Sequence, residues 1–144
     1  MKSKGVIRFF KNAIPLGQSI LFGIAGTIFG DFVLSSCLWV FSFGASFSDF
    51  LDSVLAGLFY LGTIGTISGI VFHNVLPNSR RFWIFFIAAI ATAIGFLSLA
   101  FIQPEVGTSV YEVRTHQAIV AILIVIIVRI LVEVRRRLGG MERA

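Results

Sequence analysis

The chain has 144 residues, of which 57% are hydrophobic and 13% are charged, and its formal net charge is +5. A soluble domain carries about 25% charged residues, so this composition argues against a water-soluble domain and indicates a protein of the lipid bilayer. A basic excess is also found in proteins that bind nucleic acid, but in membrane proteins basic residues mark the cytoplasmic side. We therefore expect membrane lipids as partners and no nucleic acid.

The first 13 residues, "MKSKGVIRFFKNA", have the pattern of an amphipathic helix at 100° per residue. Apolar residues share one face and basic residues the other: Val6, Phe9, Phe10 and Ala13 against Lys4, Arg8 and Lys11. This pattern predicts a short helix lying on an anionic leaflet. The alternative is a solvated tail without regular structure.

Residues 14–134 contain four apolar runs long enough to cross a membrane, since a hydrocarbon core needs about 20 apolar residues per helix. The expected spans are residues 16–43, 54–76, 82–102 and 117–134. Turn residues in "PNSRR" separate spans two and three, and residues 103–116 form the longest expected loop. The predicted fold is all-α, a transmembrane bundle of four helices with a basic tail at residues 135–144.

The first span is long for a single crossing, and a hairpin folded at Gly30 and Asp31 is the alternative. A hairpin would leave about 16 residues in each half, which is short for a span. It would also place the two basic ends of the chain on opposite sides. We therefore expect one tilted helix, and the run is too long for the apolar region of a signal peptide.

The charges favour one orientation. Every basic residue except Arg114 falls on the side of the two termini, whereas Asp49, Asp52, Glu105 and Glu112 fall on the other side. The positive-inside rule then predicts that both termini are cytoplasmic. Anionic-lipid contacts are expected at these residues: Lys4, Arg8, Lys11, Arg80, Arg81, Arg135, Arg136 and Arg137.

Small residues form stripes along three of the spans, which allows close approach of helix backbones. The packing glycines are Gly23, Gly26 and Gly30 in the first span, Gly62, Gly65 and Gly69 in the second, and Gly95 in the third. The fourth span has no glycine and only two alanines. We expect it at the periphery, against lipid or a partner.

Asp31, in "GTIFGDFVLSS", is the one acidic residue within the long apolar run of the first span. Thr27 and Ser35 each lie four residues away, so these three residues form the candidate intramembrane polar site. The sequence suggests no charged partner for Asp31, because Arg129 lies near the cytoplasmic end of its span and has Glu133 four residues on. An intramembrane acid is either a structural hydrogen-bonding group or a functional one.

No pattern indicates catalysis, a metal site or a bound cofactor. The sequence has no glycine-rich phosphate loop, no paired carboxylates and no cysteine–histidine spacing. His73 and His116 are expected at opposite membrane faces, about 30 Å apart. The lone Cys37 cannot form an internal disulfide.

Four spans with an acid in the first resemble the small multidrug-resistance transporters, with "GDF" supplying Asp31, although that family uses glutamate in a different local sequence. The arrangement is also similar to that of the GtrA-like family, which moves polyprenyl-linked sugars and has a G-x-x-N-T-x-x-D-like pattern. In "GIAGTIFGD", Gly26 stands at the asparagine and Asp31 comes one residue late. No residue role is carried over from either family.

Two functions remain open. The first is a subunit or accessory component of a larger membrane complex, indicated by the scarcity of intramembrane polar groups and the bulky fourth span. The second is a small oligomeric transporter or flippase of lipid-linked substrates, indicated by Asp31 beside a glycine stripe. Protein partners in the membrane are expected in both cases, as a hetero-complex or a homo-oligomer.

Overall fold

The computed structural model describes residues 3–41, 47–99, 101 and 110–141. Four α-helices follow one another: α1 (Ser3–Phe41), α2 (Phe47–His73), α3 (Trp83–Ser98) and α4 (Val110–Met141), with a short 3₁₀-helix η1 (Asn78–Arg80) between α2 and α3. The described residues contain no strand. The prediction of an all-α chain with four main helices is therefore confirmed.

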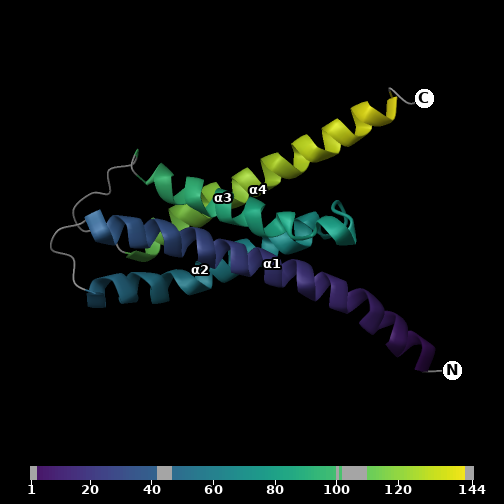
Figure 1. Ribbon diagram of the computed structural model, residues 1–144, viewed down its shortest axis with the longest axis horizontal. Coiled ribbons are helices and arrows are strands. Elements are labelled where there is room, and N and C mark those ends of the chain that lie inside the picture. The colour runs from purple at the N-terminus through teal and green to yellow at the C-terminus, as the bar shows by residue number, and fades with distance from the viewer. Residues whose placement is uncertain (1–2, 42–46, 100, 102–109, 142–144) are drawn as a thin grey trace.

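Helix α1 is one unbroken helix of 39 residues that passes through Gly30 and Asp31, so the single-helix interpretation of this run is confirmed. Residues 3–13 continue directly into it, so the expected interfacial helix is not a separate element. Pro15 lies inside the helix, where it removes one backbone hydrogen bond and favours bending. The N-terminal part of α1 curves away from the other helices (Figure 1).

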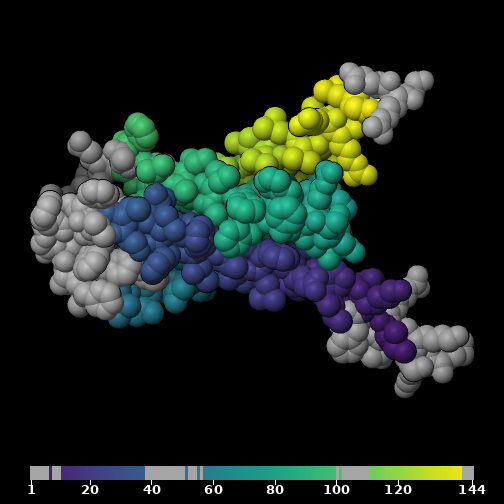
Figure 2. Space-filling view, viewed as in Figure 1, coloured from purple at the N-terminus to yellow at the C-terminus, as the bar shows by residue number. Residues whose placement is uncertain are grey.

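The helices form a four-cornered bundle. Helix α1 packs against α2 and α3, and α4 packs against the same two helices, so α1 and α4 occupy diagonal corners. Both ends of the chain lie at one end of the bundle, together with η1 (Figure 1). There the start of α1 and the end of α4 project as two separate arms (Figure 2). The expected basic tail is thus largely a helical extension of α4.

Helices α1 and α2 cross with backbone against backbone. A Cβ atom on Gly65 would lie 2.5 Å from the backbone nitrogen of Ile24, and one on Gly69 would lie 2.7 Å from the carbonyl oxygen of Ser19. Gly23 faces the same crossing. Only residues without a side chain allow this approach, and such contact replaces the hydrophobic effect as the force that joins helices in lipid.

The remaining glycines divide between two other contacts. Gly26 and Gly30 lie against the backbone of α3 at Phe85 and Ala89, so the single stripe expected on α1 serves two neighbouring helices. Gly95 of α3 lies against α4. Gly62 differs from the other predicted packing glycines, because a Cβ atom there would meet nothing within 4 Å.

Helix α4 has a close-packing face that its sequence did not suggest. Its two alanines, Ala118 and Ala121, are buried together with Val125, and a Cβ atom on Gly95 would lie 3.3 Å from that of Ala121. The opposite face exposes bulky residues such as Leu123, Ile127 and Leu131. The fourth helix is peripheral on one face only.

Two helices are long and apolar enough to cross a membrane, by length and composition: residues 11–37 of α1 and 111–140 of α4. The apolar segments Gly57–His73 and Trp83–Ser98 are shorter. At 1.5 Å per residue, the 16 residues of α3 extend about 24 Å, less than a hydrocarbon core of about 30 Å. Helix α3 is therefore shorter than the expected span at residues 82–102.

Candidate functional site

Asp31 is buried inside the bundle, with 1% of its surface exposed. It belongs to a row on α1 spaced four residues apart, which also contains Ser19, Gly23, Thr27 and Ser35. All five are buried. Because residues four apart lie on the same side of a helix, the row places Asp31 in the interior, at the end of the bundle away from the termini.

The charged partner of Asp31 is Arg114 of α4, contrary to the expectation from sequence. Arg114 Nη1 donates to Asp31 Oδ1 at 2.6 Å, and the arginine side chain is 4% exposed. Gln117 completes the cluster, with its Nε2 donating to Asp31 Oδ1 at 3.1 Å and its Oε1 accepting from Arg114 Nη1 at 2.9 Å. One amide thus contacts both charges.

The start of α4 explains why the sequence did not suggest this pairing. Residues 103–116 were expected to form a loop, but α4 begins at Val110. Arg114 therefore lies on the helix, three residues before Gln117, and both side chains share one face. Hydropathy placed the expected span start at Gln117 because polar residues precede it, whereas the helix itself begins seven residues earlier, at Val110.

Gly57 of α2 provides the space for the arginine. A Cβ atom on Gly57 would lie 2.9 Å from Arg114 Cζ and 3.0 Å from Nη2. The guanidinium therefore passes over α2 at a residue without a side chain, on its way to Asp31. Gly57 was not among the glycines singled out from sequence, because it precedes the stripe at Gly62, Gly65 and Gly69.

The ion pair crosses the diagonal of the bundle. Helices α1 and α4 are not neighbours in the packing, yet Asp31 and Arg114 join them through the centre. If the two helices moved apart, each charge would be left buried without its counter-charge, which is strongly destabilising. The cluster of Asp31, Arg114 and Gln117 can therefore set the relative position and depth of the first and last helices.

Two buried oxygen atoms at this level have no hydrogen-bond partner among the described residues: Asp31 Oδ2 and Thr92 Oγ1. Thr92 lies on α3 between Ala89, which meets Gly30, and Gly95, which meets Gln117. The sequence of contacts along α3 therefore places Thr92 at the height of the ion pair. Buried polar atoms without a protein partner are commonly satisfied by an internal water.

The other two residues of the predicted polar site do not bond to Asp31. Thr27 Oγ1 lies 2.8 Å from the carbonyl oxygen of Ile24 and 2.9 Å from that of Leu61, so its single proton is shared between the two carbonyls and ties α1 to α2. Ser35 is buried one turn beyond Asp31. The structure thus places these three residues on one row but brings Asp31 together with α4 instead.

The two histidines lie at opposite ends of the bundle. His73 ends α2, where its Nδ1 is 3.1 Å from Ser19 Oγ. His116 is in the second turn of α4, near Arg114, and its Nε2 is buried without a hydrogen-bond partner among the described residues. Within the same residues, no group of three histidine, cysteine, aspartate or glutamate side chains gathers.

The basic residues at the terminal end differ in their surroundings. Arg129 and Glu133 form the expected ion pair at 3.2 Å, and Arg137 adds a second contact to Glu133 at 3.3 Å. The side chains of Lys11, Arg80, Arg135 and Arg136 are exposed, whereas Arg81 is 9% exposed. The side chains of Lys4 and Arg8 lie outside the described ones.

Comparison with protein-family models, with curated proteins and with solved structures finds no match to this chain. The function is therefore argued from the site and the surface of the bundle.

Replacing Gly57 with alanine is expected to destabilise the bundle, although alanine is the better helix former by about 1 kcal/mol. The added methyl group would displace the Arg114 guanidinium, and overpacking of this kind costs about 1–3 kcal/mol. Unfolding of the purified chain in detergent measures the effect, with Gly62→Ala as the matched control on the same helix. Equal stability of the two variants would show that Gly57 does not seat the arginine.

Proposed function

We propose that this chain is a four-helix integral membrane protein, with both termini cytoplasmic, that serves as a subunit or accessory component of a larger membrane complex. The observation that carries the proposal is the pairing of Asp31 with Arg114 inside the chain. The sequence suggested a lone acid available for transport. An acid held by an arginine and a glutamine is instead part of the internal framework.

The composition of the surface supports a membrane location. Apolar side chains are exposed along α1, α3 and α4, among them Phe29, Phe86 and Ile127. A soluble monomer rarely exposes contiguous apolar surface on this scale. Arg114, the one basic residue on the acidic side of the sequence, is buried against Asp31, so it does not disturb the charge asymmetry that orients the chain.

The shape of α4 is compatible with a role in a complex. Its inner face contacts α2 and α3, while its outer face presents a continuous band of branched residues, which includes Leu123, Ile127 and Leu131. Such a band suits lipid or the helices of another chain equally well on packing grounds. The internal neutralisation of Asp31 makes assembly, and not translocation through this bundle, the better supported role.

The composition of the native particle tests this proposal. The tagged chain is extracted from its own membranes in a mild detergent, and the particle is analysed by native mass spectrometry. A subunit is expected in one discrete particle together with other chains at fixed stoichiometry. A discrete homo-oligomer, or a monomer, would contradict the proposal.

The topology gives a second expected result. In a Cys37→Ser background, a cysteine at Tyr111 should react with an impermeant thiol reagent from outside the cell. A cysteine at Ser79, in η1, should react only after permeabilisation. Both side chains are exposed, so accessibility in the folded chain is matched. Labelling of both from outside would contradict an arrangement in which they flank the membrane.

The second candidate is a small oligomeric transporter or flippase. Asp31 Oδ2 favours it, because this oxygen is buried without a hydrogen-bond partner among the described residues. In this alternative, the free oxygen and Thr92 Oγ1 would accept a proton or a substrate group at the centre of the bundle. A homo-oligomer whose transport disappears when the ion pair is neutralised would favour this function.

A further inference from the structure

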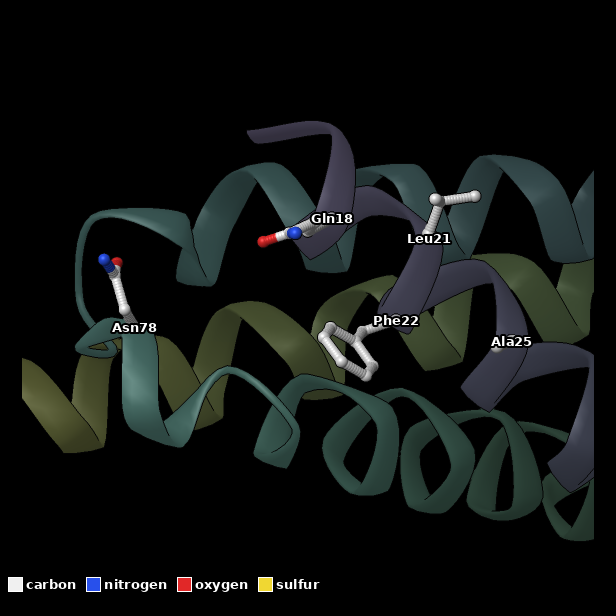
Figure 3. A pocket seen from close by; sticks show the side chains of 5 residues that line it. All are labelled: Gln18, Leu21, Phe22, Ala25 and Asn78. Atoms are coloured by element: carbon white, nitrogen blue, oxygen red, sulfur yellow. The ribbon is translucent and has the colours of Figure 1, made fainter. Parts of the chain in front are cut away.

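A groove runs along α1 at the end of the bundle that carries the termini. It is lined by Gln18, Leu21, Phe22 and Ala25 of α1 and by Asn78 of η1. The amide of Gln18 points toward the side on which Asn78 lies, and the ring of Phe22 borders the same space (Figure 3). The groove therefore has an amide-bearing end, at Gln18 and Asn78, and an apolar wall that continues toward the middle of α1.

The apolar wall lies on the outer surface of the bundle. Leu21 is 67% exposed and Phe22 is 38% exposed. Ala25, about one turn further along α1, is also exposed. In a membrane this surface faces acyl chains. The groove thus has the two-part character of a phospholipid, with hydrogen-bond donors near the interface and a hydrocarbon surface below them.

Arg81 adds a buried positive charge to the turn that holds Asn78. It is more than nine-tenths buried, its Nε has no hydrogen-bond partner, and it forms no ion pair with the described residues. Asn78 begins η1, and Arg81 follows three residues later. Arg81 therefore belongs to the same turn as Asn78, which lines the groove, and lies three residues from it along the chain.

The N-terminus of α3 adds further positive electrostatic potential to this turn. No side chain caps its N-terminus, and its first turn contains no acidic residue. The positive end of the helix dipole therefore adds to the charge of Arg81 and of its exposed neighbour Arg80. Arg81 Nε is buried without a hydrogen-bond partner among the described residues, and a buried charge without a counter-charge is unfavourable, which makes this turn a candidate anion site.

We propose that the groove binds one anionic phospholipid in the cytoplasmic leaflet. Its phosphate is held by Arg81 with the amides of Asn78 and Gln18, and one acyl chain lies over Leu21, Phe22 and Ala25. This inference rests on the membrane location proposed above. It names one site on the protein, and so differs from the general attraction between basic ends and an anionic surface.

Native mass spectrometry of the full chain, released from nanodiscs of mixed phosphatidylglycerol and phosphatidylcholine, tests the site. The wild-type chain should retain one phosphatidylglycerol in preference to phosphatidylcholine. Arg81→Gln should weaken that preference about fivefold or more. The matched control, Arg129→Gln, removes a partly exposed charge from α4 and should leave the bound lipid unchanged.

A second variant keeps the test decisive if Arg81→Gln fails to fold. Ala25→Phe fills the groove from its exposed wall, while Ile28→Phe adds bulk to an exposed site outside the lining. Loss of the bound lipid in Ala25→Phe, with retention in Ile28→Phe, supports the site. Retention in both Arg81→Gln and Ala25→Phe would overturn it.

Competition with inorganic phosphate separates a lipid from a free anion. A phospholipid held also by its acyl chain should remain bound in millimolar phosphate, and complete displacement would overturn the commitment to a lipid. The proposed membrane location is checked separately by carbonate extraction. A chain that resists extraction yet binds no preferred lipid refutes the groove alone, and a chain released by carbonate refutes the location itself.

Discussion

Removal of one partner of the central ion pair should be the most damaging polar substitution in the bundle. Arg114→Met is expected to lower the free energy of unfolding by about 3–5 kcal/mol, because it leaves Asp31 buried without its counter-charge. Asp31→Leu should have a similar effect by leaving Arg114 buried beside Gly57. Reversible unfolding in mixed detergent micelles measures both.

The double variant Asp31→Leu/Arg114→Met separates pairing from simple loss of contacts. It should be more stable than either single variant, because replacing both charges by apolar groups is often neutral or stabilising. Arg129→Met is the matched control, since its partnership with Glu133 is on the partly exposed surface of α4, where ion pairs contribute little. If the double variant lost as much free energy of unfolding as the two single variants together, the result would contradict the pairing.

The second large effect is expected where α1 and α2 touch. Gly65→Ala should destabilise the bundle by about 1–3 kcal/mol or more, because its methyl carbon would lie 2.5 Å from the backbone nitrogen of Ile24. Backbone atoms cannot move aside as a flexible side chain can, so the two helices must separate. The loss of close packing removes the main force that joins helices in lipid.

Gly62 provides a control of the same residue type on the same helix, one turn away. A Cβ atom there meets nothing within 4 Å, so Gly62→Ala should stabilise the chain by up to about 1 kcal/mol through its higher helix propensity. The two substitutions therefore have opposite expected signs. Unfolding midpoints that change in the same direction would show that the crossing is not where the structure places it.

The sequence was sufficient for the features that depend on local pattern. Four apolar runs and the turn chemistry around Pro77 predicted four helices, and the length and charge of the first run predicted one helix through Gly30. The i,i+4 spacing predicted the ion pair of Arg129 with Glu133. In each case the interacting residues are neighbours along the chain, so periodicity contains the information.

The partner of Asp31 could not be read in this way. Arg114 is 83 residues away, and no local period links the two. The polar run before Gln117 also resembles a loop. A hydropathy average counts every charged residue as polar, even one that faces a protein interior and not water. A useful signal was present: Arg114 is the single basic residue on the acidic side of the chain, and such an exception calls for a buried counter-charge.

The pairing also changes how Asp31 must be tested. Asp31→Asn alone does not isolate the role of the carboxylate charge, because it leaves the Arg114 cation buried beside a neutral amide. A loss of function in this variant would then have two explanations, instability of the bundle or removal of a functional carboxylate. Asp31→Asn/Arg114→Gln removes both charges together and keeps hydrogen-bonding groups on both helices, so it isolates the role of charge.

The central claim is that Asp31 and Arg114 hold the bundle together for assembly and perform no transport chemistry. The most direct measurement is complementation of cells that lack the chain by Asp31→Asn/Arg114→Gln, under conditions in which its loss impairs growth, with the mass of the native particle measured in parallel. The account predicts that the neutral pair assembles into the wild-type particle and restores growth. Normal assembly without restored growth would contradict it.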